Sequence, residues 1–206
     1  MSNSYFQGFL LTAGLIIAIG AQNAFVLSNA VRRNHPLLIA TLCVMGDLLL
    51  IGLGLAGAGT LVAANPGLMR YISFGGALFL TVYGTRALLS ALRGGTGLQT
   101  TNEAPVAARR AVILSTLAVT FLNPHAYLDT VVLIGGIGGR FPLEQRLLFG
   151  AGAISASTLW FFTLGFGGPF LAPLFRRQRA WRLLDGMICL VMWGIAVTLV
   201  VPYLRG

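Results

Sequence analysis

Two aspartates, Asp47 and Asp129, stand inside long apolar stretches of this sequence, where a carboxyl group could bind a cation or a proton. A charged side chain at the centre of a bilayer costs roughly 2.5–3.5 kcal/mol or more, so it normally faces a cavity or a partner. The structural alternative is an acid near a helix end that pairs with an arginine such as Arg86. A third acid, Asp185, follows Arg182 by three residues and is expected near an interface, in a structural ion pair.

Polar residues interrupt two of the apolar stretches, at 20–23 (Gly-Ala-Gln-Asn) and at 123–129 (Asn-Pro-His-Ala-Tyr-Leu-Asp). Hydrocarbon offers no water to unpaired backbone groups, so such a break requires a protein interior or an aqueous cavity. Pro124 lacks an N–H group and predicts a bend near 121–123. Asn123 can cap a new helix that has Pro124 at its first position. The amides of Gln22 and Asn23 could bind a ligand or form interhelical hydrogen bonds, worth about 1 kcal/mol.

Together these residues suit one class of ligand, an amino acid with a cationic side chain. Such a molecule needs an anion-binding spot for its carboxylate, which the N-terminal end of the helix that starts at Asn123-Pro124 can provide. It also needs one or two carboxylates for its cationic groups. The candidate substrate-binding residues are Gln22, Asn23, Asp47, Asn123, Pro124, His125, Tyr127 and Asp129, and Asp47 and Asp129 are also the candidates for proton coupling.

Composition places the chain in membranes. It has 206 residues, of which 56% are hydrophobic and 9% charged, and its mean hydropathy is +0.83. A soluble domain would carry about a quarter charged residues. The net charge of +9 comes entirely from arginines, which cluster at the ends of apolar segments, where topology signals and headgroup contacts belong. Nucleic acid is therefore not expected as a partner.

Six apolar segments predict an all-α polytopic membrane protein with six transmembrane helices. A shift of 110 positions aligns Tyr83-Gly84 with Trp193-Gly194, and a shift of 101 aligns Gln22-Asn23 with Asn123-Pro124. Three helices per half is an odd number, so the halves are expected to be inverted repeats, with helices 1 and 4 broken near the midplane. The single domain 1–206 then consists of repeat one (6–92), a loop (93–110) and repeat two (111–203). The segments are 6–31, 37–63, 68–92, 111–137, 147–169 and 181–203.

Arginines in the connections set the expected orientation. The connections after segments 1, 3 and 5 carry most of them, including Arg32, Arg33, Arg109 and Arg110. Positive loops remain in the cytoplasm, so both termini are predicted to lie outside. The alternative is a five-span topology with a cytoplasmic N-terminus, in which segment 1 does not cross the membrane.

No catalytic pattern is present, so the chain is not expected to be an enzyme or to hold a cofactor. There is no Ser/His/Asp spacing, no phosphate-binding loop and no metal-ligand spacing. The glycine pairs Gly52/Gly54 and Gly150/Gly152 indicate close helix packing rather than a nucleotide site.

The stretches 19–27 and 121–130, with Arg32-Arg33 and Gly46-Asp47, resemble the lysine/arginine exporter family (LysE/ArgO type) of bacteria. The resemblance covers essentially the whole chain, although Ala21 stands where many relatives have proline. It implies export of basic L-amino acids, arginine and/or lysine, across the cytoplasmic (inner) membrane, driven by an ion gradient. The residues that it implicates are Gln22, Asn23, Asp47, Asn123, Pro124 and Asp129.

Expelling a cation from a negative interior works against about 2.3 kcal/mol per charge per 100 mV, so proton antiport is the expected coupling. The expected partners are a basic amino acid, protons and the lipid bilayer, with a homodimer left open. Alternatives are export of homoserine or threonine, export of a metal cation on the same scaffold, and a membrane assembly protein without transport.

Overall fold

The computed structural model describes residues 2–17, 20–59, 61, 64–92, 108–171 and 178–204, and every regular element among them is helical. The predicted 93–110 loop lies outside the described residues, except for 108–110. The elements are α1 (Ser2–Ile16), α2 (Ala21–Val31), α3 (Pro36–Leu53), the π-helical turn η1 (Gly54–Ala58), α5 (Pro66–Leu92), α6 (Arg109–Phe121), α7 (Pro124–Ala126), the π-helical stretch η2 (Tyr127–Ile134), α8 (Gly135–Gly138), α9 (Leu143–Leu171) and α10 (Gln178–Leu204).

Among the described residues, which form helices and no strands, four helices are long and apolar enough to cross a membrane, so the chain is a multi-pass membrane protein. They correspond to predicted segments 2, 3, 5 and 6. Pro36 and Pro66 begin two of them, because the first helical position does not need a backbone N–H donor. The four spans are Pro36–Ala58, Pro66–Leu92, Leu143–Gly168 and Arg179–Leu204.

The two remaining segments are bent pairs of helices, and the count of spans is up to six if each pair is one span. Asn3–Ile16 meets Ala21–Val31 at 78°, and Arg109–Phe121 meets Pro124–Gly138 at 57°. Both bends fall at the polar interruptions in the sequence. At the first, Gly20 has extended backbone angles (φ −120°, ψ 174°) immediately before α2.

The second bend is organised by a helix cap and a tyrosine. The Asn123 side chain accepts a hydrogen bond from the backbone N–H of His125 at 3.2 Å, and Pro124 occupies the first position of α7. The predicted cap is thus confirmed. Upstream, the carbonyl of Phe121 accepts a hydrogen bond from the Tyr127 hydroxyl at 3.0 Å. A side chain beyond the break therefore satisfies a carbonyl at the end of α6.

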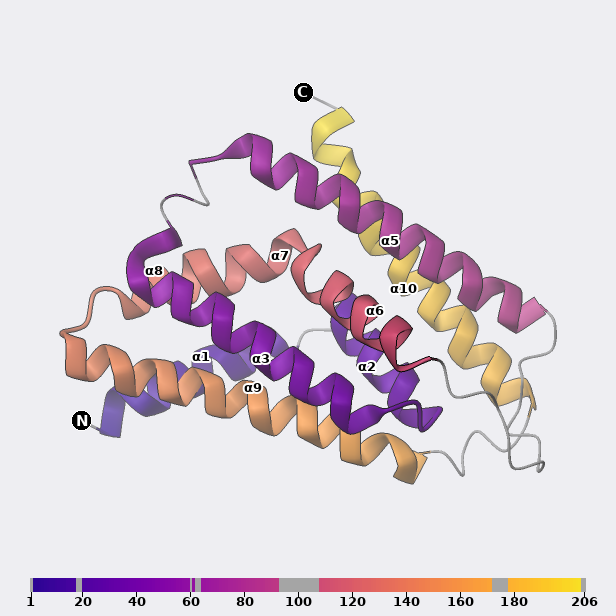
Figure 1. The fold of residues 1–206 in the computed structure, drawn as a ribbon, viewed down its shortest axis with the longest axis horizontal. Coiled ribbons are helices and arrows are strands. Elements are labelled where there is room, and N and C mark those ends of the chain that lie inside the picture. Colours follow the sequence, from indigo (N-terminus) through magenta and orange to yellow (C-terminus); the bar gives the residue numbers. More distant parts are fainter. Residues whose placement is uncertain are drawn as a thin grey trace.

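The helices pack as two groups (Figure 1). The long helices α5 and α10 run side by side as one pair, at the upper right of the view. In the other group α9 packs against α1, α2 and α3, while α6 and η2 pack against α3. A buried apolar cluster that includes Phe25, Val119 and Met192 joins the two groups. The bent pairs α1/α2 and α6/α7 thus approach the interior of the bundle between the straight helices.

Glycines allow the closest helix crossings. A Cβ atom on Gly152 would collide with the backbone of Tyr5 in α1, and one on Gly54 would collide with the backbone of Val131 in η2. Gly52 faces open space. The prediction that these glycines serve helix packing is confirmed for Gly54 and Gly152, but Gly52 makes no such approach.

Candidate functional site

A cavity of about 270 Å³ lies where the two breaks meet, between α1, α2, α3, η2 and α10. Pockets that take drug-sized ligands are about 300–1,000 Å³, so this one suits a molecule the size of an amino acid. Pro124 and Tyr127 do not line it. Six of the eight candidate residues do: Gln22, Asn23, Asp47, Asn123, His125 and Asp129.

Asp47 is the most buried acid of this cavity, with 6% of its surface exposed. Its Oδ2 accepts a hydrogen bond from the Ser157 hydroxyl of α9 at 2.6 Å. Among the described residues it forms no ion pair, and Arg86 lines a different cavity. The alternative of an acid paired with Arg86 therefore does not describe this fold.

Asp129 faces the same cavity from the other broken segment. It lies in η2 and is half-buried. No arginine belongs to the described lining of the cavity. Two carboxylates that approach one space, with no arginine in its described lining, make it complementary to a positively charged ligand.

The two neighbouring amides point in different directions, as an adjacent pair on one helix must. Gln22 donates from Nε2 to the Thr120 hydroxyl of α6 at 3.1 Å. Asn23 donates from Nδ2 to the Ile16 carbonyl at 2.6 Å, and its Oδ1 accepts from the Trp160 indole at 3.1 Å. These contacts hold the end of α1, α2, α6 and α9 together around the break, while both residues still line the cavity.

The N-terminus of α2 opens on this cavity. Gly20 and Ala21 both contribute to the lining, and no side chain caps the helix there. Backbone N–H groups and the positive end of the helix dipole favour an anionic group at such a position. The cavity thus combines an anion-favouring end with two carboxylates.

Pro124 and Tyr127 shape the second break instead of facing the cavity. Pro124 is buried at the start of α7, and the Tyr127 hydroxyl is engaged with the Phe121 carbonyl. Their geometry fits residues that position Asn123 and Asp129.

Comparison with known proteins gives the family. A family model described as LysE type translocator matches residues 13–202. The chain belongs to the LysE type translocator family. Arginine exporter protein ArgO of Enterobacter sp. (strain 638) is 43% identical over 199 residues, 97% of this chain and 94% of that protein. The protein of the same name in Salmonella enteritidis PT4 is 42% identical over 199 residues, again 97% of this chain and 94% of that protein. A candidate amino-acid transporter of Aeromonas salmonicida is 45% identical over 193 residues, 94% of this chain and 93% of that protein.

The expected resemblance is confirmed, and relatives of this LysE type translocator are transporters, not enzymes. No solved structure matches the chain significantly.

Sequence reasoning missed the hydroxyl and indole groups that hold the predicted residues. Hydroxyls in helices usually bond to their own backbone, as Ser155 does to the Ala151 carbonyl and Thr158 does to the Ile154 carbonyl. Ser157 instead bonds to Asp47 on another helix. No local sequence pattern distinguishes Ser157 from Ser155 and Thr158, because the partner of Ser157, Asp47, lies 110 positions away.

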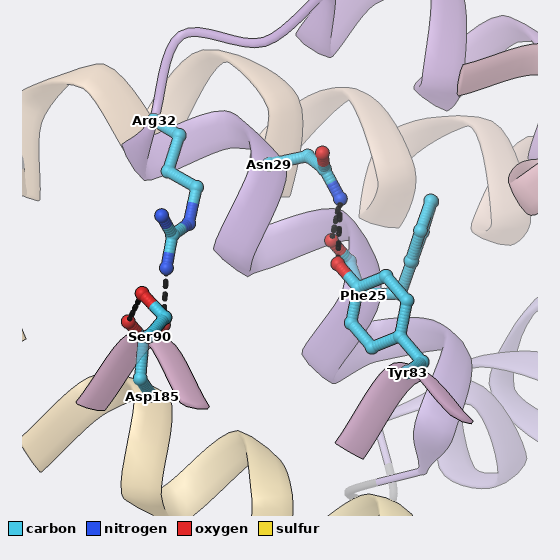
Figure 2. Close-up of polar contacts among 6 residues, drawn as sticks. All are labelled: Phe25, Asn29, Arg32, Tyr83, Ser90 and Asp185. Carbon is cyan, nitrogen blue, oxygen red and sulfur yellow. Dashed lines mark hydrogen bonds and ion pairs between the residues drawn. The ribbon is translucent and has the colours of Figure 1, made fainter. Parts of the chain in front are cut away.

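In this LysE type translocator the third acid, Asp185, lies away from the cavity at the breaks. It forms an ion pair with Arg32, and its other oxygen accepts a hydrogen bond from the Ser90 hydroxyl at 2.7 Å (Figure 2). The expected structural ion pair of Asp185 is confirmed. The sequence did not indicate its partner, Arg32, which is the C-cap residue of α2. Asp185 is 1% exposed.

Proposed function

We propose that this LysE type translocator exports basic L-amino acids, arginine first and lysine by the same chemistry, across the bacterial cytoplasmic membrane. The observation that carries the proposal is the cavity in which Asp47 and Asp129 face one space with no arginine in its described lining. Two carboxylates complement the α-amino group and the side-chain cation of a dibasic amino acid. Relatives named arginine exporters support arginine as the first substrate.

The geometry supports one pose for the substrate. Its carboxylate lies at the N-terminus of α2, where Gly20 and Ala21 line the cavity. Its cationic groups lie toward Asp47 and Asp129. Ser157 occupies Oδ2 of Asp47, and Oδ1 accepts no hydrogen bond from a described residue, so that oxygen is available to the substrate.

Proton exchange is the proposed coupling. Export of a monovalent cation opposes the membrane potential by about 2.3 kcal/mol per 100 mV, so a uniporter would accumulate arginine. A carboxylate that binds either a proton or the substrate cation couples the two fluxes. Asp47 and Asp129 are the acids of this cavity, and we assign the exchange to them.

Reciprocal packing supports two inverted three-helix repeats. The bent pair α1/α2 packs on α9, and the bent pair α6/η2 packs on α3. The remaining helices of the repeats pair with each other, α5 with α10 and α3 with α9. This exchange of partners is expected when the two halves are related by a two-fold axis, and three spans per half give the halves opposite orientations. Under this proposal each bent pair is one span, the chain crosses the membrane six times, and 1–206 is one transport domain.

The proposed orientation has both termini outside. The ends of α2 and α5 and the start of α6 lie at one end of the bundle, to the right in Figure 1. Arg32, Arg33, Arg109 and Arg110 belong to this end. Basic residues at one end favour placing it in the cytoplasm.

Counterflow in proteoliposomes tests the substrate class. Vesicles loaded with unlabelled arginine should take up labelled L-arginine and L-lysine, while labelled L-threonine and L-alanine should remain at the level of protein-free vesicles. Uptake of threonine at a rate equal to that of arginine would support the neutral amino acid alternative and reject the two-carboxylate assignment.

A further inference from the structure

A second cavity, of about 290 Å³, lies at the arginine-rich end of the bundle between α2, α5, α6 and α10. We call it the vestibule. Figure 2 shows its polar residues: Arg32 reaches Asp185, Ser90 bonds to the same carboxylate, and Asn29 donates to the Tyr83 hydroxyl at 3.3 Å. None of the eight residues predicted for the substrate site belongs to this cavity.

Asp185 is buried beside a cation, and that cation, Arg32, is the more exposed partner of the pair. The acid is 1% exposed, whereas the Arg32 side chain is 29% exposed and extends from the C-cap of α2. Removing one member of a buried pair is strongly destabilising, because the other charge remains buried without compensation. Arg32 can therefore leave Asp185 at low cost only if another cation replaces it.

The vestibule also contains a cationic side chain, Arg86, that can bind the carboxylate of a ligand. Arg86 lines it, is exposed, and forms no ion pair in the described part of the chain. Guanidinium groups bind carboxylates through two parallel hydrogen bonds. One exchangeable carboxylate and one unpaired guanidinium match the two charged ends of an amino acid with a basic side chain.

The vestibule and the cavity at the breaks share helices and follow one another along them. On α10, Asp185 faces the vestibule and Ile195 faces the cavity at the breaks, ten residues or about 15 Å further along the axis. On α2, Asn29 lines the first and Gln22 the second. The buried side chains of Val119 and Met192 belong to the apolar core between these levels.

We propose that the vestibule is a loading site for the basic amino acid, in which the substrate's cationic group replaces Arg32 on Asp185 and its carboxylate pairs with Arg86. The inference rests on the proposed export function and adds a second site to it. The substrate keeps Asp185 neutralised while Arg32 turns toward water. Because the resident group is a guanidinium, the site fits arginine better than the compact ammonium of lysine.

Binding of labelled L-arginine to the purified full-length protein in nanodiscs tests this inference. Asp47→Asn weakens the first site, and its combination with Asp185→Asn decides whether the saturable binding that remains belongs to the vestibule. Adding Arg32→Gln should tighten that residual binding roughly tenfold, because the internal competitor is gone. Adding Asp185→Asn should abolish it. Arg33→Gln, which removes a neighbouring charge, is the matched control and should leave it unchanged.

The double change Arg32→Gln/Asp185→Asn covers the case in which a single variant fails to fold. If the ion pair is purely structural, this double variant should bind as many arginines per protein as the wild type. If the vestibule is a loading site, the double variant should bind one arginine fewer than the wild type. The loading site would be overturned if the wild type binds arginine normally but neither Asp47→Asn nor Asp47→Asn/Arg32→Gln keeps any residual binding. That result would leave the proposed export function intact. If the wild-type protein binds no arginine, both proposals fail.

Discussion

The Ser157 hydroxyl donates a 2.6 Å hydrogen bond to Oδ2 of Asp47, linking α9 to α3 at the cavity where the two broken segments meet. The bond orients the carboxylate and leaves its second oxygen toward the space that we assign to the substrate. Two long helices thus position the acid, and the broken helices together with α10 supply the rest of the cavity.

Ser157→Ala should raise the KM for arginine about tenfold without unfolding the protein, because a hydrogen bond to a charged group is worth about 1.5–3 kcal/mol. Counterflow rates over a range of arginine concentrations measure the change. Ser155→Ala is the matched control, since that hydroxyl bonds to the Ala151 carbonyl of its own helix. Equal effects of the two variants would show that the contact with Asp47 has no role in transport.

Asp47→Asn should lose arginine counterflow while the protein keeps its yield and thermal stability. The amide keeps the size of the side chain but provides no charge for the substrate cation. Glu144→Gln, which neutralises an exposed acid in the first turn of α9, should transport normally. Loss of folded protein in Asp47→Asn would instead indicate a structural acid.

Asn123→Ala should lower the free energy of unfolding by about 1 kcal/mol, the usual contribution of a helix cap, and should also weaken arginine binding. Asn65 provides a control, because its side chain accepts a hydrogen bond from the Leu68 N–H at the start of α5, away from the cavity. Asn65→Ala should therefore destabilise without altering the affinity for arginine. Thermal unfolding and equilibrium binding distinguish the two.

Gly54→Ala should destabilise the protein by about 1–3 kcal/mol, the typical cost of overpacking, because its Cβ would collide with the backbone of Thr130 and Val131. Gly52→Ala, two residues earlier and facing open space, should not destabilise. The melting temperatures of the two variants in the same detergent provide the comparison. Similar melting temperatures would contradict the close crossing of η1 and η2.

Features that depend on local chemistry could be predicted from the sequence. Apolar length gives the four long spans, and Pro124 with Asn123 gives the second break and its cap. Gly20 adopts the extended backbone that begins α2, so the first bend forms without a proline at Ala21.

Contacts between distant residues could not be predicted. Arg32 and Asp185 are separated by 153 positions, and Gln22 and Thr120 by 98. A single sequence contains no periodicity or spacing that joins such pairs. Only the packing of α2 against α6 and α10 brings them together.

Arginine flux driven by a pH gradient is the most direct test of the proposed exchange at Asp47 and Asp129. Proteoliposomes with equal arginine on both sides are given a pH gradient at zero membrane potential, and labelled L-arginine is followed. Proton antiport predicts net movement of arginine toward the side with more protons, which builds up an arginine gradient, and a protonophore should abolish it. Flux that follows only the arginine gradient, whatever the pH difference, would contradict the account.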